Sequence, residues 1–255
     1  DLLIMNLKEL INLSNKAFNE RNFQEAKKIL DEAIKLNPNV YELYHKLGII
    51  SFNLGNLDDS INYFKRAISI NPESSSTLSN LGNVYFKLKK KKLAQKTYFE
   101  ALKMDPKNFN INYNLGNFFL AYDELSNAEK YLNLSIDIMP NQVLPYNNLF
   151  QLYDRSNNLE KLEKIFIKAK NNLSNNPLIN FFEGILNYRK KNYDRVIKIF
   201  ENLNLNEKDI SKNLLKNNIL AKSYDHKGVF DKAFKFYEIS NNILEKASSK
   251  KFNKD

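Results

Sequence analysis

The chain has 255 residues, of which 43% are hydrophobic and 27% charged, so it carries enough apolar material for a folded core. It contains only six glycines and six prolines, which excludes a collagen-like chain and argues against a β-sandwich with many tight turns. The absence of cysteine excludes disulfides, thiolate metal sites and a cysteine nucleophile, and two histidines leave almost no material for a histidine metal centre.

No apolar run is long enough to span a membrane, and the N-terminal segment has polar residues within its apolar pattern, unlike a signal peptide. We therefore expect a cytoplasmic protein without membrane contact. The net charge is +10, and lysine supplies most of the basic residues. A protein that reads phosphates or bases is expected to use more arginine, because the planar guanidinium matches these groups better. The composition thus argues against nucleic acid as a partner.

Residues of one kind recur along the chain at intervals of 34 residues, each series in its own phase. The prolines are Pro38, Pro72, Pro106 and Pro140, the glycines are Gly48, Gly82, Gly116 and Gly184, and the small residues of a third series include Ala26, Ala94 and Ala128. Several series that share one interval indicate an array of repeats that stack on one another.

The array divides into seven repeats within one domain that covers residues 1–255. In chain order the repeats are about 7–40, 41–74, 75–108, 109–142, 143–176, 177–213 and 214–247, and a basic tail, 248–255, follows. The sixth repeat contains an insertion of three residues before the period resumes. Positions are counted below from the first residue of each repeat.

Each repeat is predicted to form two helices, at about positions 2–14 and 18–30. Apolar residues at positions 4, 7, 8 and 11, and again at 17, 20, 24 and 27, have the spacing of one helix face. Small residues at positions 8 and 20 allow the two helices to approach closely, and a large residue at position 24 fills the remaining space. The proline at position 32 ends the second helix because it lacks a backbone N–H.

Five residues depart from this pattern, and the first is Ser14, which stands where glycine is usual in the first repeat. Phe150 and Leu162 stand where small residues are usual, which requires looser or shifted packing in the fifth repeat. Glu183 occupies an otherwise apolar position and puts the helix register of the sixth repeat in question. Pro177 is out of phase with the other prolines and is expected to be the first residue of a helix, where proline is tolerated.

The repeats share the pattern Leu-Gly-x-x-aromatic, then Ala-x-x-x-aromatic-x-x-Ala, then Pro. This pattern resembles the tetratricopeptide repeat, and residues 81–106 are a near-complete match. The resemblance covers nearly the whole chain. It implies an all-α fold, an α-solenoid of about seven helix-turn-helix units that forms a right-handed superhelix. It also implies that the first helices line a concave groove, in which a protein or an extended peptide binds without a cofactor.

Positions 6 and 9 of the first helices point away from the predicted apolar face and are candidates for ligand contacts. Four repeats place an amide at both positions, namely Asn12 and Asn15, Asn80 and Asn83, Asn114 and Asn117, and Asn148 and Gln151. A carboxamide offers two donors and two acceptor lone pairs, so a row of amides can bind the N–H and C=O groups of a peptide backbone. The position-6 asparagines resemble the asparagine ladder of O-linked N-acetylglucosamine transferases. The alternative is a solvated polar face, because asparagine is abundant throughout the chain. His45 is expected to face the groove without a catalytic role.

The chain contains no phosphate-binding loop, metalloprotease motif or nucleophile elbow, so we expect no enzymatic activity from this chain alone. The segment 220–255 resembles the last repeat and exit helix of bacterial proteins in which such repeats precede a sulfotransferase domain. Tyr224, Asp225, Gly228 and the run Phe230–Phe234 carry this resemblance. It implies the substrate-recruiting part of a larger transferase. A free-standing adaptor and an RNA-binding helical repeat remain as alternatives, and the sequence leaves the oligomeric state open.

Overall fold

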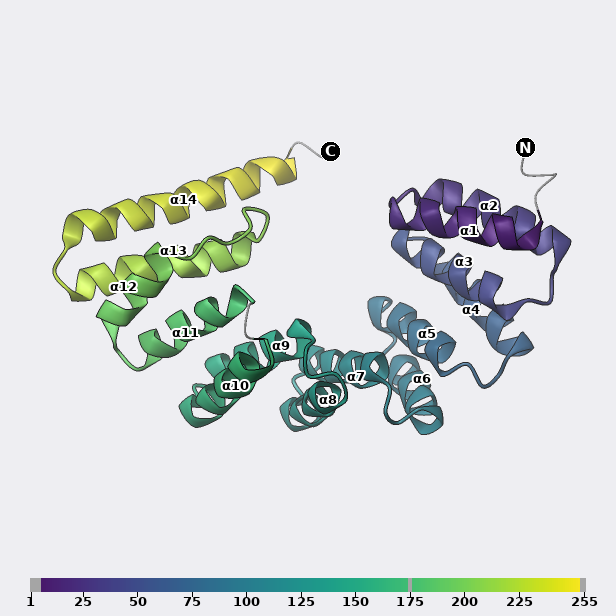
Figure 1. The fold of residues 1–255 in the computed structure, drawn as a ribbon, viewed down its shortest axis with the longest axis horizontal. Coiled ribbons are helices and arrows are strands. Elements are labelled where there is room, and N and C mark those ends of the chain that lie inside the picture. The colour runs from purple at the N-terminus through teal and green to yellow at the C-terminus, as the bar shows by residue number, and fades with distance from the viewer. Residues whose placement is uncertain (1–5, 174–175, 253–255) are drawn as a thin grey trace. The chain divides into compact units, whose positions relative to one another are not determined.

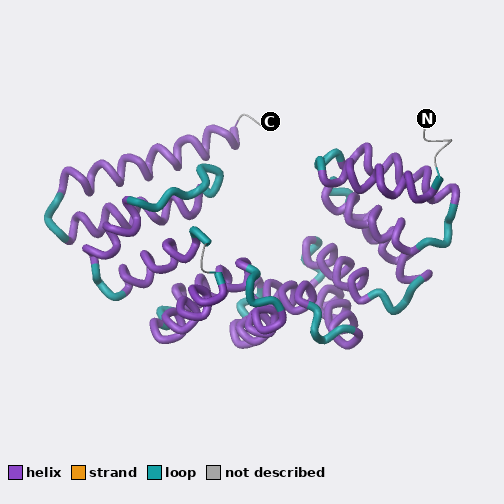
Figure 2. Tube along the Cα trace, in the orientation of Figure 1, coloured by secondary structure: helices purple, strands orange, loops and turns teal. Residues whose placement is uncertain are grey.

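The computed structural model describes residues 6–173 and 176–252, and within these ranges all regular secondary structure is α-helical (Figures 1 and 2). The helices of these ranges are α1 (Leu7–Asn19), α2 (Phe23–Leu36), α3 (Tyr41–Asn53), α4 (Leu57–Ile70), α5 (Ser75–Lys87), α6 (Lys91–Met104), α7 (Phe109–Ala121), α8 (Leu125–Ile138), α9 (Val143–Arg155), α10 (Leu159–Asn172), α11 (Leu178–Arg189), α12 (Tyr193–Glu201), α13 (Ile210–His226) and α14 (Phe230–Phe252). The predicted all-α architecture of helical pairs is confirmed.

The ends of several helices follow from residues that recur at the same position in different repeats. The second helices α2, α4, α6 and α8 each end two residues before the proline of their repeat. Proline cannot donate to a helix, and it disfavours a helical conformation of the residue before it. The starts of the second helices α2, α10 and α12 are capped by Asn22, Asn158 and Asn192, whose side chains accept a hydrogen bond from the N–H three residues later.

The two helices of a repeat pack through a glycine and a large residue sixteen positions later. A Cβ added at Gly48 would lie 2.5 Å from the ring of Phe64, and one added at Gly82 would lie 2.7 Å from the ring of Tyr98. Gly116 meets Leu132 in the same way. The glycine therefore creates the space that the large residue fills, as the sequence pattern predicts.

The sixth repeat keeps this register in spite of its glutamate. Gly184 faces the buried ring of Phe200, the same pairing as in the earlier repeats. Glu183 lies at the edge of the buried face, where its carboxylate forms an ion pair of 2.6 Å with Arg195. The fifth repeat differs, because Phe150 replaces the glycine and its ring stacks on Phe182 with 4.2 Å between ring centroids.

The chain divides into two compact units, residues 1–139 with α1–α8 and residues 140–255 with α9–α14. In the first unit, buried apolar residues form one cluster over α1–α3 and another over α4–α8. Within each unit successive helices are in contact, and first helices also touch one another, as α3 and α5, α5 and α7, and α11 and α13 do. Within each unit the first helices thus lie in a row, so their free faces form one surface.

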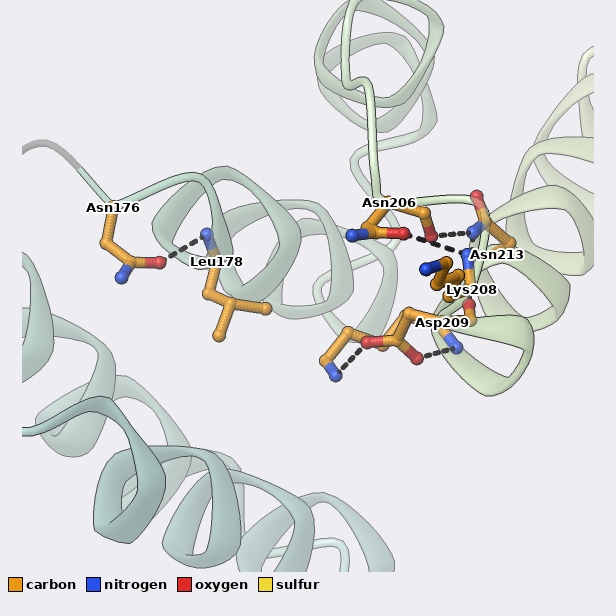
Figure 3. A network of polar contacts seen from close by, with 7 residues as sticks. Asn176, Leu178, Asn206, Lys208, Asp209 and Asn213 are labelled. Carbon is orange, nitrogen blue, oxygen red and sulfur yellow. Dashed lines mark hydrogen bonds and ion pairs between the residues drawn. The ribbon is translucent and has the colours of Figure 1, made fainter. Parts of the chain in front are cut away.

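The insertion near residue 213 is absorbed by changes in helix length. Helix α12 has only nine residues, and α13 has seventeen and begins at Ile210, before the predicted start of the seventh repeat. The loop between them is held by Asn206, whose carbonyl accepts from Asn213 Nδ2 at 2.8 Å and whose Oδ1 accepts from the Lys208 N–H at 2.9 Å (Figure 3). Asp209 caps α13 by accepting from the N–H of Lys212 (Figure 3).

Two sequence interpretations of helix ends are adjusted by the structure. Pro177 immediately precedes α11 as its N-cap residue, so the helix begins one residue later than expected. Helix α14 continues through Phe252 and so includes the first part of the segment 248–255 that the sequence analysis describes as a basic tail. The residues there, which include two serines and two lysines, contain no glycine or proline to end a helix.

The turn between the two helices of each repeat has a left-handed residue at position 15. These residues are Arg21, Gly55, Lys89, Asp123, Asn157, Lys191 and Gly228, with φ between 52° and 82°. Only two are glycine, although a side chain in this conformation costs about 1–2 kcal/mol. The packing of the two helices therefore imposes the left-handed conformation at this position, even where the residue type disfavours that conformation.

Replacing Lys89 with glycine is expected to raise the free energy of unfolding by about 0.5–1 kcal/mol, because relief of the left-handed strain exceeds the added entropy of the unfolded chain. Urea denaturation followed by circular dichroism measures the change. Lys92→Gly, a few residues later inside α6, is the matched control and is expected to lose about 1 kcal/mol. Equal losses for both variants would contradict the prediction.

Candidate functional site

The structure gathers three of the eight predicted amides, Asn80, Asn83 and Asn114, around one open cavity of about 410 Å³ in the first unit. We call it the amide cavity. Its lining residues, from α3, α5, α7 and the residue that caps α7, are His45, Ser76, Ser79, Asn80, Asn83, Asn108, Asn110, Ile111 and Asn114. All but Ile111 are polar and none is a carboxylate, lysine or arginine. The cavity therefore offers hydrogen bonds without a fixed charge.

Two of these amides are held by the preceding repeat. Asn114 Nδ2 donates to Ser79 Oγ at 3.1 Å, and Asn80 Nδ2 lies 3.5 Å from His45 Nε2. Ser79 and His45 both occupy position 5, so each pair joins position 5 of one repeat to position 6 of the next. The described residues donate no hydrogen bond to Oδ1 of Asn80 or of Asn114. Both oxygens remain available to a donor on a ligand.

His45 anchors a chain of hydrogen bonds beneath the cavity. Its Nδ1 lies 2.8 Å from Thr77 Oγ1, which in turn lies 2.7 Å from Ser74 Oγ. Because Nε2 accepts from Asn80, the proton of a neutral imidazole is on Nδ1 and is donated to Thr77. Burial lowers the pKa of His45, and the positive charge of Lys46 lowers it further, while Glu42 acts in the opposite direction. The imidazole is therefore neutral at pH 7.

Stability of the first unit is expected to fall as the pH is lowered through 6.5, the ordinary pKa of histidine. Because the pKa of His45 is depressed in the folded chain, the unfolded chain binds this proton first, and stability decreases until the pH passes the folded pKa. Thermal unfolding at a series of pH values measures the slope. His45→Gln is expected to flatten it, because glutamine takes up no proton in this pH range. An unaltered slope in this variant would contradict the assignment.

Asn83 has a structural role that its position did not reveal. Its Oδ1 accepts a hydrogen bond of 2.6 Å from the hydroxyl of Tyr98, the fully buried residue that packs on Gly82. Burial strongly raises the pKa of this tyrosine, which stays neutral and donates. Asn83 therefore satisfies a hydroxyl of the core in addition to lining the cavity.

The other five predicted amides lie elsewhere. Asn15 accepts a hydrogen bond from Lys46 Nζ, and burial lowers the pKa of that lysine. Asn12 is exposed on α1, and Asn117 and Asn148 are half-buried on α7 and α9. Gln151 is exposed on α9 in the second unit and lines a different cavity.

Sequence reasoning missed the hydroxyl groups that support the amides. Ser79 is a small polar residue without a motif of its own, and Ser74 and Thr77 lie at the start of a helix, where such residues usually serve as caps. A signal is present in the spacing, because the partners of Asn80 and Asn114 each lie 35 residues earlier. A search for pairs of polar residues that lie 35 residues apart, one repeat length plus one residue, would have found both hydrogen-bonded pairs.

Two further classes of site are absent from the described part of the chain. No group of three or more histidine, aspartate or glutamate side chains in residues 6–173 and 176–252 could hold a metal ion. Among the helices of these residues, none combines the length and the apolar character needed to cross a bilayer.

Comparisons with known proteins agree with the helical pairs. Sequence profiles described as the tetratricopeptide repeat match residues 10–40 and 75–108, and a profile described as the TPR repeat matches residues 50–89. A comparison with curated protein sequences finds no significant match.

Several solved structures are similar in fold. The C-terminal part of a TPR repeat-containing protein from Cytophaga hutchinsonii has a TM-score of 0.68 and 16% identity, over 91% of this chain and 94% of that one. A tetratricopeptide repeat protein from Parabacteroides merdae has a TM-score of 0.63 and 16% identity, over 93% of each chain. PilF of Pseudomonas aeruginosa has a TM-score of 0.66 and 16% identity, over 77% of this chain and 90% of that one. At these identities the likeness concerns the fold.

Proposed function

We propose that the chain is a scaffold whose amide cavity holds the backbone of an extended peptide. Residues 10–40, 50–89 and 75–108 match models of the tetratricopeptide repeat, and such repeats generally mediate protein interactions. The observation that carries this proposal is the tethering of Asn80 and Asn114. Each amide nitrogen contacts a side chain of the preceding repeat, while each amide oxygen has no donor among the described residues. A tethered amide loses little conformational freedom when it binds a ligand.

The chemistry of the cavity favours a peptide backbone over a charged ligand. Each amide oxygen can accept a backbone N–H, and the second hydrogen of each Nδ2 can be donated to a backbone carbonyl. The cavity has no fixed charge, and His45 is neutral, so it provides nothing to pair with a phosphate or an ammonium group. An extended peptide exposes the required donors and acceptors whatever its side chains are. We therefore expect this cavity to accept many sequences.

Replacing Asn80 and Asn114 together with alanine is expected to weaken peptide binding by about tenfold or more, because about two hydrogen bonds are lost at 0.5–1.5 kcal/mol each. The probe is a set of peptides selected from a displayed random library on the unaltered chain, with affinity measured by fluorescence anisotropy. Unfolding curves are expected to change little, because both amides face an open cavity.

Asn62→Ala is the matched control, since this exposed asparagine lies on the second helix α4. Its peptide affinities are expected to equal those of the unaltered chain. Equal affinities for the Asn80, Asn114 variant would contradict the proposal and favour a solvated polar face. An equal loss for the control would show that the selected peptides bind elsewhere.

We further propose that the scaffold recruits substrates for a larger transferase, of the sulfotransferase or a glycosyltransferase class. The support is the resemblance of the segment 220–255 to the repeat region of bacterial sulfotransferase proteins. Reading the gene beyond the codon of Asp255 tests this proposal directly. A following Pro-Arg-Ser-Gly-Thr loop would support it, whereas an early stop codon would contradict the fused arrangement and favour a free-standing adaptor.

A further inference from the structure

A second cavity, of about 210 Å³, lies in the second unit between the first helices α9, α11 and α13. Its apolar lining comes from Phe150, Phe181, Phe182, Ile185 and Leu215, and we call it the aromatic cavity. Pockets for small molecules usually measure about 300–1,000 Å³, so this one has the size expected for a side chain. It differs in chemistry from the amide cavity, although both are formed by first helices.

The floor of the aromatic cavity consists of packed, buried rings. Phe150 and Phe182 stack at 4.2 Å with 17° between their planes, and Phe181 lies beside Phe182 at 6.4 Å. All three rings are at most 4% exposed. Leu215 is 40% exposed at the rim, so a guest side chain would bury apolar surface that now faces water.

In the sixth repeat, two positions that carry amides in four other repeats carry apolar residues instead. Phe182 and Ile185 are positions 6 and 9 of this repeat, where the third and fourth repeats have asparagine. The fifth repeat, which also belongs to the second unit, keeps Asn148 and Gln151 at these positions, and Gln151 lines the aromatic cavity. The free face of α11 is therefore apolar where the free faces of α5 and α7 form hydrogen bonds, and it is suited to an apolar side chain.

The charges around the aromatic cavity leave one cation without a partner. Asp154 forms an ion pair of 2.6 Å with Arg189, and Lys212 pairs with Asp209. Arg155 lines the cavity, is exposed, and forms no ion pair with the described residues. Its guanidinium is suited to bind a carboxylate through two parallel hydrogen bonds.

We propose that the aromatic cavity binds a large apolar side chain of a partner peptide in which a neighbouring residue is aspartate or glutamate. The apolar side chain enters between Phe182 and Leu215, and the carboxylate pairs with Arg155. This inference rests on the proposed function in that the ligand is a peptide, but it uses no residue of the amide cavity. The two cavities supply different parts of recognition, because one reads backbone groups and the other reads a pair of side chains.

The test uses the displayed random peptide library, selected on the full chain and counter-selected on the Arg155→Gln, Leu215→Asp double variant. Both positions are exposed, so the double variant is expected to fold. Peptides that only the unaltered chain retains are expected to share Leu, Met or Phe beside Asp or Glu. In anisotropy titrations, Arg155→Gln is expected to weaken these peptides about tenfold. For peptides in which Gln replaces Glu, Arg155→Gln is expected to leave the affinity unchanged. Lys198→Gln on α12, which also removes one positive charge, is the matched control.

Four outcomes would overturn the inference. Selected peptides without the apolar and acidic pair would do so, and so would peptides that bind the double variant as well as the unaltered chain. A dimer in sedimentation that Leu215→Asp dissolves would show that a second copy of the chain covers the cavity instead. If the Asn80, Asn114 variant loses binding while Arg155→Gln does not, the proposed function stands and this inference alone is wrong.

Discussion

Replacing Phe150 with glycine, the residue that the repeat pattern favours at this position, is expected to destabilise the second unit by about 4 kcal/mol. The ring of Phe150 is 2% exposed and stacks on Phe182, so glycine would leave a large hole beside a buried aromatic ring. The substitution also adds the cost of glycine inside helix α9. A change toward the consensus of the repeats is thus expected to be harmful here.

Urea denaturation followed by circular dichroism measures this loss. Phe234→Gly is the matched control, because Phe234 lies on helix α14 of the same unit and is 71% exposed. Only the intrinsic cost of glycine in a helix, about 1 kcal/mol, is expected for the control. Similar losses for both variants would mean that the stacked pair contributes little to stability.

Gly184→Ala is expected to cost about 3 kcal/mol, although alanine is the better helix former. Its Cβ would overlap the ring of Phe200, which is fully buried and stacks on Phe181 at 6.0 Å. Because the ring of Phe200 is fully buried, the new Cβ requires a shift of this ring or of α11 against α12.

The double variant Gly184→Ala, Phe200→Leu tests this cause. A leucine at this position removes part of the ring that the new Cβ meets, so the double variant is expected to be more stable than the sum of the two single losses predicts. Calorimetric or urea unfolding of the four proteins gives the coupling energy. Additive losses would show that Gly184 is needed for some reason other than Phe200.

The periodic part of the fold could be predicted from the sequence because each repeat uses the same local rule. The pairing of Gly184 with Phe200 follows from the pairing of Gly48 with Phe64, and Glu183 did not shift the register. The early start of α13 could not be predicted, since it depends on hydrogen bonds of Asn206 within one loop. A loop of this kind has no counterpart in the other repeats from which a pattern could be taken.

The candidate site was predictable in its residue types and only partly in its geometry. Helix periodicity places an amide on the free face of a first helix, but it does not show which neighbours lie beside it. Asn80 and Asn114 meet side chains of the preceding repeat, whereas Asn83 meets the hydroxyl of Tyr98 within its own repeat. The change from amides to Phe182 and Ile185 was readable in the sequence, but the cavity beside them depends on the stacking of Phe150.

The hydrogen bonds that join neighbouring repeats connect residues that are close along the chain. Asn80 to His45, Asn114 to Ser79 and Arg189 to Asp154 each span 35 residues. Each of these hydrogen bonds closes a segment of only 35 residues, which has a low entropic cost. Folding can therefore begin at one repeat and spread to the next. During synthesis, each repeat therefore needs only the repeat that follows it to complete these bonds. The chain can become ordered from its N-terminus while its later repeats are still inside the ribosome.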